Sequence, residues 1–140
     1  MKTKLEQNFI DWLDPNELPF NHRYFNFSYG KMPYIDEGKG ETVVFVHGTP
    51  TWSFLYSNYI KFLSTKYRCL AIDHLDFGLS DKPKDFIDTS EAHAKNFTKW
   101  IEALRLEKFT LIFHDFGEPN AKIVEFIVDI LYRKKGLELP

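Results

Sequence analysis

Short apolar stretches and helical patterns alternate along most of the chain. Residues 22–29 place an aromatic side chain at every second position from Phe25 to Tyr29. This period of two predicts a half-buried strand. Gly30 then turns the chain, and residues 32–36 are predicted to return as the second strand of a hairpin.

Three later stretches are short apolar runs: residues 42–46, 67–72 and 109–113. Unbroken runs of this kind are typical of strands that are covered on both faces. Helical patterns separate and follow them. A hairpin followed by alternating strands and helices predicts an α/β fold, with a mainly parallel sheet and helices on both sides.

The three predicted helices differ in how clearly their apolar faces are marked. Residues 53–64 have helical spacing, with Phe54, Leu55, Tyr59, Phe62 and Leu63 in register. The second helix is predicted to begin near Asp88, where Glu91 gives a pair resembling a capping box. Its apolar residues are interpreted as core and not as a binding face; they are Phe97, Trp100, Ile101 and Leu104. The last helix covers residues 122–134, with Ile123, Phe126, Ile127, Ile130 and Leu131 on one face.

Composition narrows the class of protein. The 140 residues are 44% hydrophobic and 27% charged, as in globular domains, and we interpret residues 1–140 as one partial domain. A net charge of −2 without a basic run gives no indication of a nucleic-acid partner, and none is expected. The single cysteine, Cys69, lies in an apolar run and is predicted to be a buried thiol. Without a secretory signal or a membrane span, a cytoplasmic location is expected.

The stretch around Asp115 carries the clearest sign of chemistry. An apolar strand ends there in His114-Asp115-Phe116-Gly117, and a helical pattern follows. A polar residue on a sharp strand-to-helix turn is how an α/β-hydrolase presents its nucleophile. Taken alone, Asp115 would be better explained as the N-cap of the following helix, a role that Asp often fills.

Two other motifs change that interpretation. His47-Gly48-Thr49-Pro50 directly follows the strand at 42–46, and residues 73–83 read Asp-His-Leu-Asp-Phe-Gly-Leu-Ser-Asp-Lys-Pro. Together with the Asp115 motif, in this order and spacing, they resemble the α/β-hydrolases. Within that family the resemblance is to the haloalkane dehalogenases and epoxide hydrolases, whose nucleophile is Asp. It runs from about residue 12 to about residue 119.

The resemblance implies a role for each matching residue. Asp115 would attack a small apolar substrate, displacing halide or opening an epoxide, and leave an ester on the enzyme. The backbone N–H groups of Thr49 and Phe116 would form the oxyanion hole. His47 would support the loop with Gly48, Pro50 and Gly117, and not act as a base. No cofactor or metal is implied, since Asp73 and Asp76 lack a further ligand pattern; His22, His74 and His93 are interpreted as surface or loop residues.

Several positions depart from the family pattern. Phe116 stands where the dehalogenases have Trp, whose indole N–H helps to hold the leaving halide, and Phe has no such donor. Glu118 occupies the place of a second Gly, and its charge lies near Asp115 in the sequence. Asp76 also replaces a Gly.

The sequence of 140 residues matches only the N-terminal half of such an enzyme. Family members continue with a cap, a catalytic acid and an essential His, whereas no histidine follows Asp115 here. The fold expected is therefore the first half of an α/β-hydrolase sheet, with the cap and C-terminal half absent. Two readings stay open: a hydrolase by ancestry, or a catalytically incomplete relative that binds a partner. In the second case residues 109–113 would form an exposed sheet edge prone to self-association.

Overall fold

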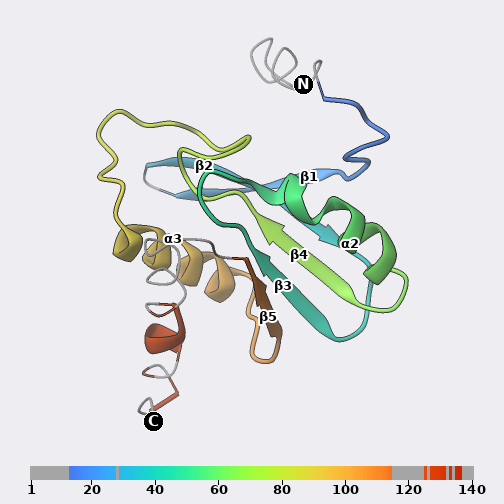
Figure 1. Ribbon diagram of the computed structural model, residues 1–140. Helices are drawn as coiled ribbons and strands as arrows, with labels where there is room; N and C mark the ends of the chain where they lie inside the picture. Colours follow the sequence, from blue (N-terminus) through green and yellow to red (C-terminus); the bar gives the residue numbers. More distant parts are fainter. Residues whose placement is uncertain are drawn as a thin grey trace.

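The computed structural model describes residues 13–27, 29–114, 125, 127–131, 133, 135 and 136. Five strands and three helical segments have both of their ends in this part of the chain (Figure 1). The strands are β1 (His22–Phe27), β2 (Gly30–Glu37), β3 (Thr42–Val46), β4 (Arg68–Ile72) and β5 (Thr110–Phe113). The helical segments are the 3-10 helix η1 (Ser53–Tyr56) and the α-helices α2 (Ser57–Leu63) and α3 (Ser90–Ala103).

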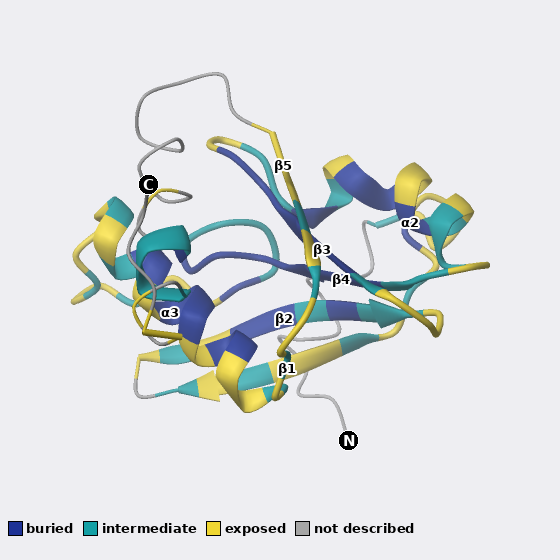
Figure 2. Cartoon of the chain, turned by 90° about the horizontal axis from the view of Figure 1, so that it is seen from below, coloured by how far each residue is buried: buried dark blue, intermediate teal, exposed yellow. Residues whose placement is uncertain are grey.

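The strands form one mixed sheet in the order β1-β2-β4-β3-β5. β1 and β2 make the predicted hairpin, and β2 also pairs antiparallel with β4. β3 lies between β4 and β5 and is parallel to both. The sequence-based prediction of an α/β sheet with a hairpin and parallel strands is thus confirmed. β5 is the last strand in the described sheet, opposite to the hairpin (Figure 2).

Two hydrophobic cores cover the two faces of the sheet. Val44 and Val46 point to the face covered by α3, whereas Val43 and Phe45 point to the face covered by η1 and α2. Strand residues that alternate between two buried faces are all apolar, which explains the unbroken run in β3. Helices on both sides therefore confirm the predicted layering (Figure 1).

Cys69 and the α3 aromatics occupy these cores as expected. Cys69 is buried, and burial raises the pKa of its thiol to about 11. Phe97, Trp100 and Ile101 of α3 are also buried against the sheet. The aromatic face of this helix is therefore core, as the sequence indicated.

The predicted apolar face of residues 53–64 is only partly correct, since Phe54 and Leu63 pack against the core but the other predicted residues do not. Tyr59 is 61% and Phe62 is 78% exposed, whereas Tyr56 and Ile60 are buried. The first turn is a 3-10 helix, with three residues per turn, and the α-helix begins only at Ser57. This change of period shifts the inward face away from the positions that a single α-helix would predict.

The predicted start of the second helix also needs correction. The N-cap of α3 is Thr89, whose hydroxyl accepts a hydrogen bond from the Ala92 N–H at 3.1 Å. Thr89 has the extended backbone that an N-cap needs. Asp88 instead accepts a hydrogen bond from Nε2 of His93 at 2.6 Å.

The last predicted helix lies partly outside the described residues. Within residues 122–134, positions 125, 127–131 and 133 are helical. Ile127 is buried in the core on the α3 side, and Ile130 and Leu131 pack against that core. None of the helices in the described part of the chain has the length and apolarity that crossing a membrane requires.

Candidate active site

The parallel register brings all three sequence motifs to one edge of the sheet, since Val46 at the end of β3 lies opposite Ile72, the last residue of β4 before the motif at residues 73–83. Val46 also lies opposite Phe113 at the end of β5. His47 and His114 are the residues that follow them, so the His47 motif and the Asp115 motif leave neighbouring strands at the same edge. Ligands of open α/β sheets bind at this end of the strands, beyond their carboxyl termini.

His47 is held by two hydrogen bonds at the end of β3. It is buried, its Nδ1 donates to the Gly48 carbonyl at 2.9 Å, and its Nε2 accepts from the backbone N–H of His74 at 2.9 Å. Only the neutral ring protonated at Nδ1 can make both bonds. Burial lowers the pKa of His47, although Asp73 and the Gly48 carbonyl oppose this effect. Since both ring nitrogens are engaged, His47 joins two loops and has no nitrogen left to act as a base.

The Gly48 carbonyl is the centre of a tight turn. In addition to the bond from the His47 ring, this carbonyl accepts two hydrogen bonds from Thr51. The Thr51 backbone N–H donates at 3.0 Å and the Thr51 hydroxyl at 2.8 Å. Gly48 is buried, whereas Thr49 and Pro50, joined by a cis peptide bond, are exposed. The turn therefore fixes the backbone of Thr49 at the surface beside the strand ends. Its role as an oxyanion-hole donor stays a prediction.

Asp73, at the start of the middle motif, has a structural role. Its Oδ1 accepts from the Ser53 N–H at 2.8 Å, and its Oδ2 accepts from the Leu79 N–H at 3.0 Å. The carboxylate thus ties the loop after β4 to the start of η1. In the described part of the chain, no group of three or more His, Cys, Asp or Glu side chains could hold a metal ion.

Two residues of this loop adopt left-handed backbone conformations. Gly78 has φ +54°, and a Cβ there would lie 2.5 Å from Oδ2 of Asp73. Asp76 has φ +67°. Asp is one of the few residues that tolerate this region, which explains how it can stand where the resembled family has Gly.

His74 lies in the loop after β4 as interpreted, but neither His74 nor His93 is a surface residue, and His93 belongs to α3. Each histidine is only 2% exposed, and with His47 they form a row of rings with centroids 4.6 Å (His47–His74) and 5.4 Å (His74–His93) apart. Both ring nitrogens of His74 are buried without a hydrogen-bond partner among the described residues. Burial, and then His47 and His93, lower the pKa of His74 well below its usual value. Helical spacing could have identified His93, since it lies four residues before Phe97 on the inward face of α3.

The remaining predicted site residues lie outside the part of the chain that the structure describes. They are Asp115, Phe116 and Gly117, together with Glu118. Their assignment rests on the sequence motif and on the position of His114, which directly precedes Asp115.

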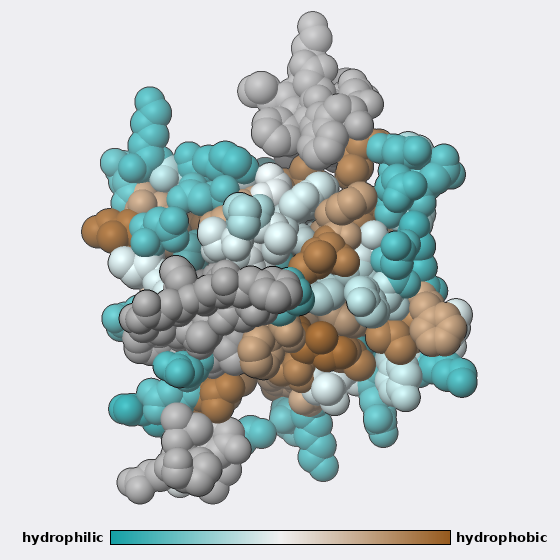
Figure 3. All heavy atoms as spheres, in the orientation of Figure 1, coloured by the Kyte–Doolittle hydropathy of each residue, from teal (hydrophilic) through white to brown (hydrophobic). Residues whose placement is uncertain are grey.

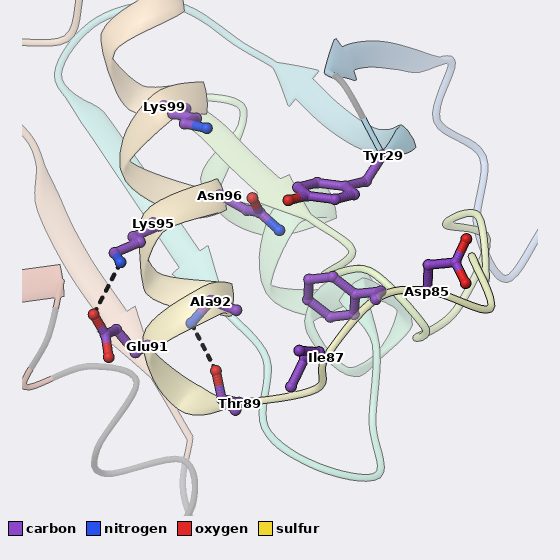
Figure 4. A pocket seen from close by; sticks show the side chains of 10 residues that line it. Tyr29, Asp85, Ile87, Thr89, Glu91, Ala92, Lys95, Asn96 and Lys99 are labelled. Atoms are coloured by element: carbon purple, nitrogen blue, oxygen red, sulfur yellow. Dashed lines mark hydrogen bonds and ion pairs between the residues drawn. The ribbon is translucent and has the colours of Figure 1, made fainter.

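One surface pocket lies apart from the motif residues (Figure 4). It holds about 340 Å³ between the first turns of α3, the loop before them and Tyr29. Asn96 and Lys99 of α3 line it together with Phe86 and Ile87 of the preceding loop. None of the residues of the three motifs lines this pocket. It therefore gives no support to the chemistry expected at the strand ends.

Comparison with known proteins identifies relatives for most of the chain. Haloalkane dehalogenase 2 of Mycobacterium tuberculosis is 40% identical over 111 residues, which cover 79% of this chain and 39% of that protein. A cis-3-alkyl-4-alkyloxetan-2-one decarboxylase of Shewanella oneidensis is 39% identical over 103 residues, covering 71% of this chain and 32% of that protein. The crystal structure of the haloalkane dehalogenase DatA from Agrobacterium tumefaciens matches with a TM-score of 0.69 and 28% identity, covering 82% of this chain and 37% of that one.

This chain therefore spans about a third to two fifths of the length of these relatives. The model of the alpha/beta hydrolase fold matches residues 41–117, which include the His47 motif, the loop after β4 and the stretch from His114 to Gly117. With more than half of its residues matched by that model, the chain belongs to the alpha/beta hydrolase fold family.

Proposed function

We propose that this chain carries the nucleophilic half of a haloalkane dehalogenase-like hydrolase, with Asp115 as the attacking group. The observation that carries the proposal is the pairing of Val46 with Phe113. It places the start of the His47 loop beside His114, the residue before Asp115. A nucleophile and a backbone oxyanion donor need this proximity if they are to act on one substrate.

The proposed chemistry begins with displacement at a saturated carbon. A carboxylate oxygen of Asp115 forms a bond to the carbon, and the halide leaves with the electron pair of the broken bond. The product is an alkyl ester of Asp115. Water would then attack the ester carbonyl, and the N–H groups of Thr49 and Phe116 would stabilise the negative oxygen that results.

The second step needs a base that these 140 residues do not offer in a suitable place. No histidine follows Asp115 in the sequence, and both ring nitrogens of His47 are already hydrogen-bonded. We therefore propose that a polypeptide of these 140 residues forms the ester but does not release alcohol repeatedly. Complete turnover would need a base and an acid supplied by further polypeptide.

The leaving group is the open part of the proposal. Phe116 cannot donate a hydrogen bond to a departing halide as the Trp of the dehalogenases does. An epoxide would need a donor as well, because the alkoxide formed when its ring opens must be protonated by another group. The similarity to two oxetan-2-one decarboxylases supports a four-membered lactone as a second candidate substrate class.

Three electrophiles can separate these possibilities in one assay. The protein would be incubated with a 1-bromoalkane, a terminal epoxide and an oxetan-2-one of equal chain length, while intact mass and product release are followed. One stable adduct per chain, absent in Asp115→Asn, is expected with at least one electrophile. Repeated turnover that Asp115→Asn abolishes would contradict the proposed lack of a base. No adduct with any of the three would contradict the nucleophile itself.

A further inference from the structure

Asn96 is a polar residue of α3 that is buried without a hydrogen bond. It is 5% exposed, and its amide nitrogen Nδ2 has no partner among the described residues. The large majority of buried side-chain polar atoms in folded proteins are paired. Asn also forms helices less well than Ala, so an unpaired Asn within α3 is unfavourable for two reasons. The missing partner is a hydrogen-bond acceptor, which a ligand can supply.

The Asn96 amide faces the surface pocket of Figure 4. Four residues of α3 line this pocket at the spacings that place them on one face of the helix: Ala92, Lys95, Asn96 and Lys99. Figure 4 shows the amide pointing away from the helix toward Tyr29, which lines the same pocket and is 55% exposed. An exposed ring changes its rotamer readily. A turn of the Tyr29 ring therefore gives a ligand access to Nδ2.

The charges around the pocket favour one negative group beside Asn96. Lys95 is ion-paired with Glu91 at 2.9 Å, so these two residues add no net charge. Lys99 follows Asn96 on the same face of α3, is exposed, and has no ion-pair partner among the described residues. Asp85 lies at the opposite end of the pocket (Figure 4). An anionic group is therefore attracted to the end formed by Asn96 and Lys99.

One side of the pocket is apolar. Phe86 and Ile87 of the loop before α3 line it, and Ile87 is 76% exposed. The rings of Tyr29 and Phe86 lie 6.3 Å apart in an edge-to-face arrangement. An exposed isoleucine beside two rings is stabilised when an apolar group covers it. The volume of about 340 Å³ is sufficient for a small molecule.

We propose that this pocket binds a small monocarboxylate with an apolar body. One carboxylate oxygen accepts a hydrogen bond from Nδ2 of Asn96, and the other pairs with the ammonium group of Lys99. The body covers the apolar side of the pocket. A dianion such as phosphate fits less well, because one unpaired ammonium group does not balance its charge. The site is separate from the proposed active site, since none of the three motifs contributes a residue to it.

The first test is an NMR titration of the isotope-labelled protein with 3-phenylpropionate. The backbone amide signals of residues 92–99 should shift and reach saturation. The amide 3-phenylpropanamide has the same shape without the charge, and it should bind about three- to fivefold more weakly because it cannot pair with Lys99. Equal affinities for the acid and the amide, or no saturable shift along α3, would overturn the inference. Saturable shifts with inorganic phosphate at equal affinity would overturn the choice of a monocarboxylate.

The second test assigns the two contacts by substitution. Asn96→Ala removes the donor and should weaken binding of 3-phenylpropionate by about tenfold or more, since a hydrogen bond to a charged group is lost. Lys99→Gln should weaken it by about three- to fivefold. Asn58→Ala is the matched control, because Asn58 is an exposed residue of α2, and it should leave the affinity unchanged.

Asn96→Ala is expected to remain folded, since the amide nitrogen that it removes has no partner. Its urea midpoint should be no lower than that of the wild type. Wild-type affinity in a folded Asn96→Ala variant would overturn the inference. If Asn96→Ala does not fold, the affinity of Lys99→Gln decides the matter, and a value equal to that of the wild type would overturn the inference.

Discussion

Replacing His74 with Phe is predicted to stabilise the fold at neutral pH. The His74 ring is buried against His47, His93 and Phe97, and neither of its nitrogens has a partner among the described residues. A buried polar group without a hydrogen bond costs about 1–3 kcal/mol. Phe removes that cost but is slightly larger, so the expected net gain is about 1 kcal/mol. The bond from the His74 backbone N–H to His47 is kept.

The same substitution should make the fold less sensitive to acid. Burial lowers the pKa of His74 and of His47 below the usual value of 6.5, and Asp73 opposes the effect at His47 only in part. Each group then binds its proton more readily in the unfolded chain. The free energy of unfolding is therefore unaffected by these two histidines above about pH 6.5. It decreases as the pH falls below that value, because the unfolded chain takes up protons that the folded chain does not. Each histidine contributes at most about 1.4 kcal/mol per pH unit, so the wild type loses up to about 2.7 kcal/mol per unit and His74→Phe about half of that.

Urea unfolding between pH 7.5 and pH 5.0, followed by circular dichroism, would measure both effects. His114→Gln is a suitable control, since it removes a histidine whose side chain is exposed. This variant tests whether the loss of any histidine changes the pH dependence of stability. A His74→Phe variant that is more than about 1 kcal/mol less stable than the wild type at pH 7.5, or that keeps the full slope, would refute the reasoning.

Three further predictions concern the loop after β4 and the sheet edge. Asp76→Gly should be at least as stable as the wild type in thermal unfolding and Asp76→Val less stable by more than about 1 kcal/mol, since φ is +67° there; equal melting temperatures would contradict this. Asp73→Asn should cost about 1–3 kcal/mol, because its amide would point a donor at the N–H of Ser53 or Leu79; an unchanged urea midpoint would argue against that role. The chain should self-associate through β5 in sedimentation at micromolar concentration, and Ile112→Lys should reduce this, because a charge protects an edge; a wild-type monomer would exclude it.

The edge prediction agrees with the described surface. Ile112 is 37% and Phe113 is 49% exposed on β5, which has no described strand on its outer side. Hydrophobic side chains also gather near the position of β5 on the face drawn in Figure 3. Self-association itself stays a proposal, and the sedimentation experiment decides it.

The sheet could be predicted from the sequence because its signals are local. The period of two in residues 22–29 indicates a strand with one buried face. The unbroken apolar run at 42–46 indicates a strand with two buried faces. These are properties of consecutive residues, and they do not depend on how the helices pack.

The errors arise where burial depends on tertiary packing. A 3-10 turn after Trp52 changes which side of residues 53–64 faces the sheet. The types of residue in this segment do not indicate that turn. His74 has a polar side chain, but the rings of His47 and His93 enclose it from other elements.

The central claim is that Asp115 forms a covalent ester, and peptide mapping tests it most directly. The protein would be treated with the electrophile that gives an adduct, digested, and sequenced by tandem mass spectrometry. The account predicts one alkyl group on the Asp115 carboxylate, removed by mild base, and none on the neighbouring His114 or Glu118. Label on either neighbour would contradict the claim. So would labelling of Asp115 at the same rate in the urea-unfolded protein as in the folded protein.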